Sequence, residues 1–454
     1  MQFLARLRLG ANVPAVLLII LATAVWVGGG GSRGNLLGQA LVRAAAWTCL
    51  VLMALLGSRR PVLRGKVVLG FVLASILLAA LQLVPLPPAW WAGLPGRSAY
   101  AVADVIAGGA PPWRPMAIVP SLTRNALNSL VVPLATVLLI ADPRRVNDRL
   151  ILRLLVCLVV ATMGLGLLQF AGIPLYVPII NGGDEISGNF ANKNHYALVM
   201  AFGLMLVPVW AFYEQRAMNW RVPVTLALIP LLVLAILASG SRAGMAVGII
   251  ALAVAGVLVR RPLRYALRRY PRWVLPSVVG GMIVTLVSLF AVSFVAGRAV
   301  SVDRALALDP SQDMRRSGLP TVWAMVGEYF PIGAGLGSFD TIFRQHEPIS
   351  LLKLTYFNRA HDDFLEIVLD AGLLGLVLMM AVLGWWAAMS WRVWRPRKIS
   401  DTVLPRVGSA MLLLTMLASI VDYPARTPMI MFLVVIAAVW LGEHSEQGEG
   451  SFTG

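Results

Sequence analysis

The sequence predicts an all-α polytopic membrane protein, and three observations lead to that prediction. Hydrophobic residues make up 59% of the 454 residues, charged residues make up 13%, and the mean hydropathy is +0.79. Soluble domains are about a quarter charged. The apolar residues also fall in runs of about 20, the length that a helix needs to cross a hydrocarbon core about 30 Å thick. The chain is therefore expected to cross a membrane many times.

About twelve runs have this length, and we expect residues 1–442 to form a single transmembrane domain. The first run follows Arg6 and Arg8. It is interpreted as a retained helix, because no polar spacer or clear cleavage site separates it from the next run. The tail 443–454 is polar and is expected to be disordered. The expected spans are 12–29, 36–57, 66–84, 125–141, 150–172, 194–213, 222–239, 243–259, 273–296, 363–391, 405–421 and 427–442.

The basic residues predict the orientation of these spans. If the N-terminus lies in the cytoplasm, 23 of the 38 Lys and Arg residues fall in cytoplasmic segments and 5 in short outer loops. The remaining ten lie in two long outer loops, 85–124 and 297–362, where the positive-inside rule has little force. Both termini are therefore expected in the cytoplasm. This topology and anionic membrane lipids account for the net charge of +17. No nucleic-acid partner is expected, because no basic region interleaved with aromatic residues lies on a soluble module.

The two long outer loops are the places where a site could form. Loop 85–124 is rich in Pro and Trp, which suits an interfacial cap of rigid turns and aromatic anchors. Loop 297–362 is the catalytic candidate, and its apolar spacing predicts a surface helix over 321–330. The segment 333–339 resembles a phosphate-binding glycine loop in its letters only. It follows no strand and lacks the closing Lys-Ser/Thr pair, so we interpret it as a tight turn.

His361 is the best candidate for a catalytic group. It lies where a polar loop meets a long apolar run, and Arg359, Asp362 and Asp363 lie beside it. An imidazole at the mouth of a membrane helix, with arginines nearby, suits a base that faces an anionic lipid-linked substrate. Asp362 or Asp363 is also expected to cap the helix that begins there. Capping and catalysis can coexist at this point of the chain.

The other histidines and the carboxylate pair have simpler interpretations. For His195 and His346 a structural role, capping or hydrogen-bonding at an interface, is favoured over a functional one, and His444 is interpreted as a solvated residue of the tail. Asn192, His195, Arg359 and Asp362 are kept as secondary site candidates. Asp362 and Asp363 could in principle bind a divalent ion, but two carboxylates that open a helix usually cap it. We therefore expect no metal and no other cofactor.

Four arginines are candidates for binding a diphosphate. Arg242 lies in a hairpin so short that its guanidinium must sit close to hydrocarbon. This costs a few kcal/mol unless the charge is paired, and either a substrate or a lipid phosphate reached by snorkelling would serve. Arg315 and Arg316 precede the predicted surface helix, and Arg124 lies where the first long loop returns to the membrane. Two or three such arginines could bind the oxygens of a diphosphate in a forked geometry.

Several short motifs occur in a fixed order. They are Asn189 to His195, with Asn192 among them, then Ser241-Arg-Ala-Gly244, Pro331 to Phe339, His361 to Glu366, and Gly372-Leu-Leu-Gly375. In order and spacing they resemble the O-antigen ligase/polymerase superfamily of bacterial inner-membrane proteins. The resemblance covers roughly residues 180 to 390, and the first third matches only as a set of spans.

The resemblance implies a GT-C-like glycosyltransferase whose active site faces the periplasm and whose donor is a polyprenyl-diphosphate-linked glycan. By that analogy Arg242 and an arginine before the surface helix hold the diphosphate, and His361 acts on the acceptor hydroxyl. The family often has an arginine about four residues before the position of Trp323, where this chain has Leu319. Arg316 is the proposed substitute, and Arg315 is its rival.

The available groups suggest a mechanism and several functions. A histidine, which titrates near pH 6.5 in water, can accept the hydroxyl proton, and attack opposite the diphosphate would invert the anomeric centre. Ligation to the lipid A core is favoured over polymerisation of repeat units, which would use the same donor and another glycan as acceptor. Transfer to a protein hydroxyl is a further alternative. A transporter or flippase would carry its ionisable residues on broken helices at mid-membrane. The sequence does not decide the oligomeric state.

Overall fold

The computed structural model describes most of the chain. The backbone is described for residues 2–56, 64–173, 175, 177, 179–180, 185–213, 220–267, 310–352, 358–395 and 402–449, and for scattered residues between 271 and 291. Within these ranges the side chains of residues 2–12, 267, 310–316 and 444–449 are not described.

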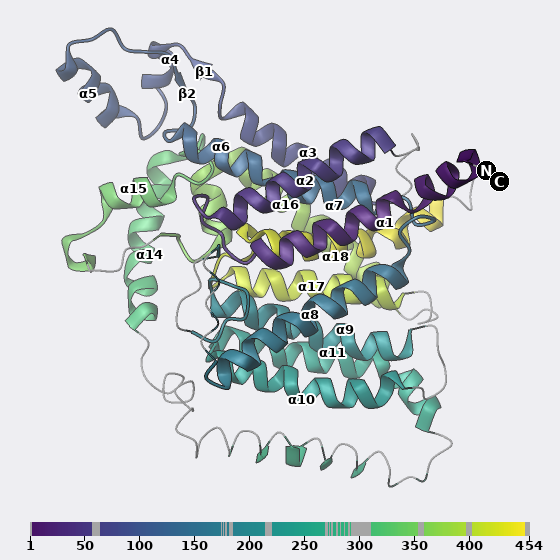
Figure 1. The fold of residues 1–454 in the computed structure, drawn as a ribbon. Helices are drawn as coiled ribbons and strands as arrows, with labels where there is room; N and C mark the ends of the chain where they lie inside the picture. The colour runs from purple at the N-terminus through teal and green to yellow at the C-terminus, as the bar shows by residue number, and fades with distance from the viewer. Residues whose placement is uncertain are drawn as a thin grey trace.

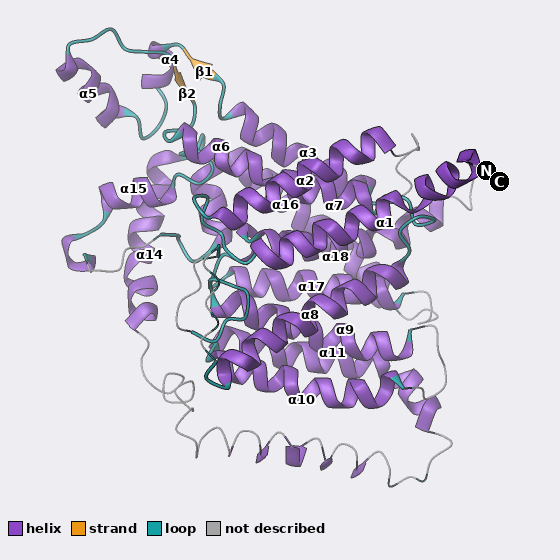
Figure 2. Ribbon diagram, viewed as in Figure 1, coloured by secondary structure: helices purple, strands orange, loops and turns teal. Residues whose placement is uncertain are grey.

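The described chain is almost entirely helical, and its long helices lie side by side in one bundle (Figures 1 and 2). The bundle helices are α1 (Gln2–Gly28), α2 (Leu37–Leu56), α3 (Lys66–Leu81), α6 (Pro120–Ser129), α7 (Val131–Leu139), α8 (Asp148–Phe170), α9 (Lys193–Phe212), α10 (Arg221–Ser239), α11 (Arg242–Leu267), α16 (Asp363–Trp394), α17 (Val403–Ser419) and α18 (Pro428–Glu449).

The helices confirm the expected membrane architecture. Seven helical segments are long and apolar enough to cross a membrane, with α6 and α7 together forming one of them. Shorter apolar helices include α3, α17 and parts of α1 and α18. These elements fall on eleven of the twelve expected spans, and the span 273–296 lies largely outside the described residues. The fourth span differs in detail, because its helix already begins at Pro120, five residues before the expected start.

Helix α9 is the most buried of the seven long apolar segments in the described part of the chain. Its side chains are buried on all sides, and it packs against α8, α10, α11 and α17. A helix that is apolar around its whole circumference is typical of a protein core or of a membrane span, and here neighbouring helices cover it. Its first residues therefore hold a fixed position relative to the helices around them, which matters for the polar groups described below.

The smaller elements gather at one end of the bundle, which we call the loop end (Figure 1). They are α4 (Pro88–Ala92), α5 (Ser98–Ala107), the antiparallel strand pair β1 (Pro85–Leu86) and β2 (Arg114–Pro115), α14 (Pro310–Tyr329), α15 (Phe339–His346) and the short helix η1 (Ile349–Leu351). The predicted surface helix is present as α14, and it begins before the expected residue 321. The strand pair was not expected.

The beginning of α1 and the end of α18 lie at the opposite end of the bundle from the loop end (Figure 1). The tail 443–454 was expected to be disordered, but α18 continues to Glu449. Its first residues are therefore helical, whereas 450–454 lie outside the described residues.

The glycine-rich segment 331–337 connects α14 to α15 and packs against a break in α16. Gly372 has φ 57° inside that helix, and a Cβ there would collide with the Pro331 carbonyl. The carbonyls that the break frees accept hydrogen bonds from the segment: Ala334 N donates to Leu369 O at 2.9 Å, and Gly335 N to Asp370 O at 2.8 Å. The segment is thus a tight structural turn, as predicted, since it satisfies backbone groups of α16 that would otherwise lack partners.

Candidate active site

His361 lies at the loop end, immediately before α16. The Asp362 side chain accepts a hydrogen bond from Leu365 N at 3.1 Å and so caps the helix, as expected. His361 itself has φ 53°, and it is the only described residue other than glycine with a positive φ. Such backbone conformations cost about 1–3 kcal/mol and cluster at functional sites. The chain therefore holds this imidazole in a conformation that the surrounding contacts must enforce.

Asp422 is the carboxylate that faces His361. Its side chain is 2% exposed and lies in the connection between α17 and α18. Its Oδ1 lies 3.4 Å from His361 Nδ1, and its Oδ2 accepts hydrogen bonds from Asn192 Nδ2 at 2.9 Å and Asn194 Nδ2 at 2.7 Å. Asp422 was not among the residues predicted from the sequence. An ionisable residue in a short connection between two apolar runs was the available signal, because such a residue is costly near hydrocarbon without a partner.

Tyr423 lies between two histidines. Its ring centroid is 5.1 Å from that of His361 and 5.3 Å from that of His195. Burial, together with the neighbouring Asp422, raises the pKa of Tyr423 to about 12. The phenol therefore remains protonated at neutral pH. His195 is buried, and its Nδ1 lies 3.0 Å from Thr427 Oγ1. The structure thus brings His195, a secondary candidate for which a structural role was favoured, into the same cluster as His361.

A chain of hydrogen bonds connects this cluster to the Arg242 hairpin. Asn192 caps α9 by accepting from Asn194 N at 2.8 Å. The Oδ1 of Asn194 accepts from Ser241 Oγ at 2.7 Å, and Ser241 Oγ accepts in turn from Gly244 N at 2.8 Å. Arg242, the first residue of α11, follows Ser241 directly and is partly buried. The hairpin and the Asn192 segment, distant in sequence from His361, therefore meet at Asp422.

A buried ion-pair network lies beneath His361. Arg426 Nη1 lies 3.1 Å from Glu366 Oε1, and Arg426 Nε lies 3.2 Å from Asp363 Oδ1. Glu366 also accepts from Arg359 Nη1 at 3.0 Å and from the backbone N of Ala360 at 2.9 Å. Burial alone would lower the pKa of Arg426, but the surrounding carboxylates raise it. Arg359, a secondary candidate because it lies beside His361 in the sequence, is therefore bound to a carboxylate of the protein itself.

Three predicted arginines are not placed in the cluster. Arg124 is exposed on α6, and within the described part of the chain no hydrogen bond or ion pair joins it to the cluster. Arg315 and Arg316 fall in the first half of α14, where side chains lie outside the described residues. His346 has a structural environment, as expected: its ring nitrogens lie 2.9 Å from Ile342 O and 2.9 Å from Glu328 Oε2.

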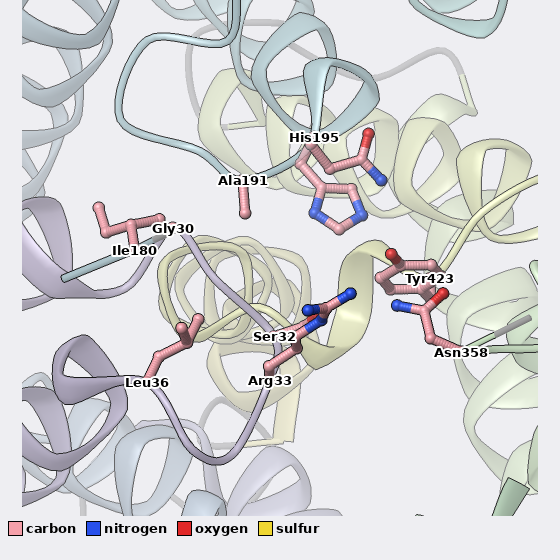
Figure 3. A pocket seen from close by; sticks show the side chains of 10 residues that line it. Gly30, Ser32, Arg33, Leu36, Ile180, Ala191, His195, Asn358 and Tyr423 are labelled. Carbon is pink, nitrogen blue, oxygen red and sulfur yellow. The ribbon is translucent and has the colours of Figure 1, made fainter. Parts of the chain in front are cut away.

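A cavity of about 110 Å³ lies beside Tyr423 and His195 (Figure 3). Polar side chains gather on one side of it and apolar side chains on the other. Its lining residues come from the α1–α2 connection, from the segment before α9 and the first turn of α9, and from two further places: Asn358, shortly before His361, and Tyr423, directly after Asp422. The polar ones are Ser32, Arg33, Asn192, His195, Asn358 and Tyr423.

Comparison with known proteins agrees with the motifs. No curated protein matches the chain. Residues 225–380 match the family model described as O-antigen ligase. The matched region contains Arg242 and His361, whereas Asp422 and the Asn192–His195 segment lie outside it. The resemblance drawn from the motifs is therefore confirmed: over residues 225–380, this all-α membrane protein is similar to the O-antigen ligase family.

Proposed function

We propose that the protein is a glycosyltransferase of the bacterial inner membrane that transfers a glycan from a polyprenyl-diphosphate carrier to an acceptor hydroxyl on the periplasmic face. The family match supports an activity of the O-antigen ligase or polymerase type. The observation that carries the mechanism is the approach of His361 Nδ1 to Asp422 Oδ1, at 3.4 Å, at the loop end of the bundle. A base oriented by a buried carboxylate is a recurring arrangement for activating a hydroxyl.

The proposed reaction uses one base and one leaving group. Asp422 holds the proton on Nδ1 of His361, so that Nε2 presents its lone pair to the acceptor hydroxyl. The hydroxyl oxygen forms a bond to the anomeric carbon, and His361 Nε2 takes its proton. The bond between that carbon and the diphosphate oxygen breaks, and polyprenyl diphosphate leaves with the electron pair. Attack from the side opposite the leaving group inverts the anomeric centre.

Arginines would stabilise the charge that develops on the leaving diphosphate. The hydrogen bonds from Ser241 through Asn194 to Asp422 support this role for Arg242, since they fix its hairpin beside the proposed base. Arg316 or Arg315 would supply a second cation from α14. Arg359 has a different proposed role, because its ion pair with Glu366 holds the backbone next to His361.

Ligation to the lipid A core remains the favoured reaction, with polymerisation of repeat units as the alternative. Helix α16 has two features that are also typical of transporters. It is broken at Gly372, and it carries buried carboxylates. Those carboxylates are paired with Arg426 and with the backbone of the 331–337 segment, and they do not line the cavity. This arrangement favours a fixed joint over a transport path.

The test is a transfer assay with purified protein, lipid-linked glycan donor and acceptor, with EDTA present and ATP absent. We expect wild-type turnover under these conditions and none from His361→Ala, with donor binding retained. His346→Ala is the matched control and should remain active. Lipid A core and lipid-linked repeat units, offered separately as acceptors, distinguish ligase from polymerase. Turnover by His361→Ala, or a wild-type activity that EDTA abolishes and Mg²⁺ restores, would show that the mechanism is wrong.

A further inference from the structure

We propose that the cavity beside Tyr423 binds a phosphate group of a prenyl-linked substrate, with Arg33 and His195 as its principal ligands. This inference rests on the proposed function, because it assigns the lipid end of the donor to a place next to the proposed base. Arg33 lies in the α1–α2 connection, far in sequence from the arginines that the motifs singled out.

The chemistry of the lining favours an anion. Arg33 contributes a cation, and Ser32, Asn358 and Tyr423 contribute groups that can donate hydrogen bonds. No carboxylate belongs to the described residues that line the cavity. The nearby Asp422 is directed to other partners, since its Oδ2 accepts from Asn192 and Asn194. A sugar hydroxyl can pair with acceptors as well as with donors, whereas phosphate oxygens need donors. A guanidinium surrounded by other donors therefore suits a phosphate.

His195 gives an independent indication of a ligand. It is 2% exposed and lines the cavity, yet its Nε2 has no hydrogen-bond partner among the described residues. The nearest carboxylate oxygen, Asp422 Oδ1, is 4.0 Å away, which is too far for a hydrogen bond. That carboxylate nevertheless favours a proton on Nε2, with Nδ1 accepting from Thr427. Buried polar groups are normally paired, so Nε2–H is a donor that a bound phosphate oxygen would satisfy.

The size and the apolar wall fit the lipid end of the donor. A volume of about 110 Å³ leaves room for a phosphate and the first carbons of a chain. Figure 3 shows Leu36 and Ile180 on the side away from Tyr423 and Asn358. The wall is held rigidly, because Ala191 N donates to Gly30 O at 3.0 Å and a Cβ at Gly30 would collide with the Asn189 carbonyl.

The cavity is also correctly placed for a leaving group. The Tyr423 ring contacts both His195, which lines the cavity, and His361, the proposed base. A phosphate bound here would thus lie on one side of Tyr423 with the base on the other. The cation of Arg33 would then stabilise the diphosphate as it departs.

The experiment measures binding of farnesyl diphosphate to the purified protein in phosphatidylcholine nanodiscs, without acceptor. We expect Arg33→Ala to weaken binding by about ten- to a hundredfold, the usual effect of losing one hydrogen bond to a charged group. Arg33→Lys should retain more affinity than Arg33→Ala. The matched control is Arg344→Ala, which removes an exposed cation that is paired with Asp340 on α15 and does not line the cavity. It should change the affinity less than twofold.

Binding of a second ligand, and binding in a second lipid, identify which chemical group occupies the cavity. Farnesol should bind much more weakly than farnesyl diphosphate, and its binding should not depend on Arg33. Equal affinity of wild type and Arg33→Ala for farnesyl diphosphate would overturn the proposal. So would loss of binding in phosphatidylglycerol nanodiscs, because a lipid headgroup would then occupy the cavity. The readout does not require transfer, so a protein that binds the ligand through Arg33 but transfers no glycan would refute the proposed function alone.

Discussion

Replacing Asp422 with asparagine tests the catalytic arrangement most directly. The substitution keeps the shape of the side chain and removes its charge. The Oδ2 position faces two amide donors, Asn192 and Asn194, whereas Oδ1 accepts from one donor of the backbone, Tyr423 N, at 3.0 Å. The new amide should therefore direct its oxygen toward the two asparagines and its NH₂ group toward His361. That group would donate to Nδ1, and the imidazole proton would move to Nε2. The nitrogen that should accept the hydroxyl proton would then carry one.

Two estimates of the effect agree. At the 3.4 Å that separates His361 Nδ1 from Asp422 Oδ1, Coulomb's law with an effective dielectric constant near 20 gives about 5 kcal/mol for the carboxylate acting on a protonated imidazole. This corresponds to a rate decrease of about 10³–10⁴-fold. The corresponding carboxylate-to-amide change in a serine protease triad, which fixes the wrong tautomer, costs about 10⁴-fold.

The assay compares turnover of lipid-linked donor by purified wild-type and Asp422→Asn proteins at saturating acceptor. We expect kcat to decrease by roughly 10³-fold or more, with donor affinity within about threefold of wild type, because the change acts on the chemical step. Asp340→Asn is the matched control, since it removes a partly exposed carboxylate of the same loop end. If Asp422→Asn retained a tenth of wild-type kcat, Asp422 would not orient the base.

Three further predictions concern the bundle and its charges. An alkaline-phosphatase fusion at residue 265 should be inactive, because the basic segment there is predicted to be cytoplasmic; an active fusion would invert the topology. Arg242→Ala should lower transfer by about 10²–10³-fold and Arg242→Lys should rescue it poorly; full activity of both proteins at normal abundance would exclude the diphosphate role. Arg426→Ala should destabilise the protein by about 3–5 kcal/mol, because it leaves Glu366 and Asp363 buried without their cation; an unchanged thermal midpoint in detergent would contradict that role.

Local patterns predicted the parts of the site that depend on neighbouring residues. Asp362 caps α16 as expected, and His361 lies at the junction of loop and helix where its polar neighbours placed it. The segment 331–337 is a turn, as its glycines indicated. The ion pair of Arg359 with Glu366 was not predicted, because the sequence around Glu366 indicates only the first turn of a membrane helix. Sequence alone does not show which face of that helix meets the loop.

Apolar run length by itself determined the class and most spans of this protein, because a helix must satisfy its own backbone hydrogen bonds within a hydrocarbon layer of fixed thickness. The sequence also determined the resemblance to the family, because the motifs within 225–380 follow one another in a single stretch of chain. Tertiary structure decided the rest. Asp422 and Arg33 come from connections and Asn194 from the first turn of α9, all far apart in sequence. They lie near His361 and His195 only because the packed helices bring their ends together. The break at Gly372 has the same origin, since it exists where the Pro331 backbone approaches α16.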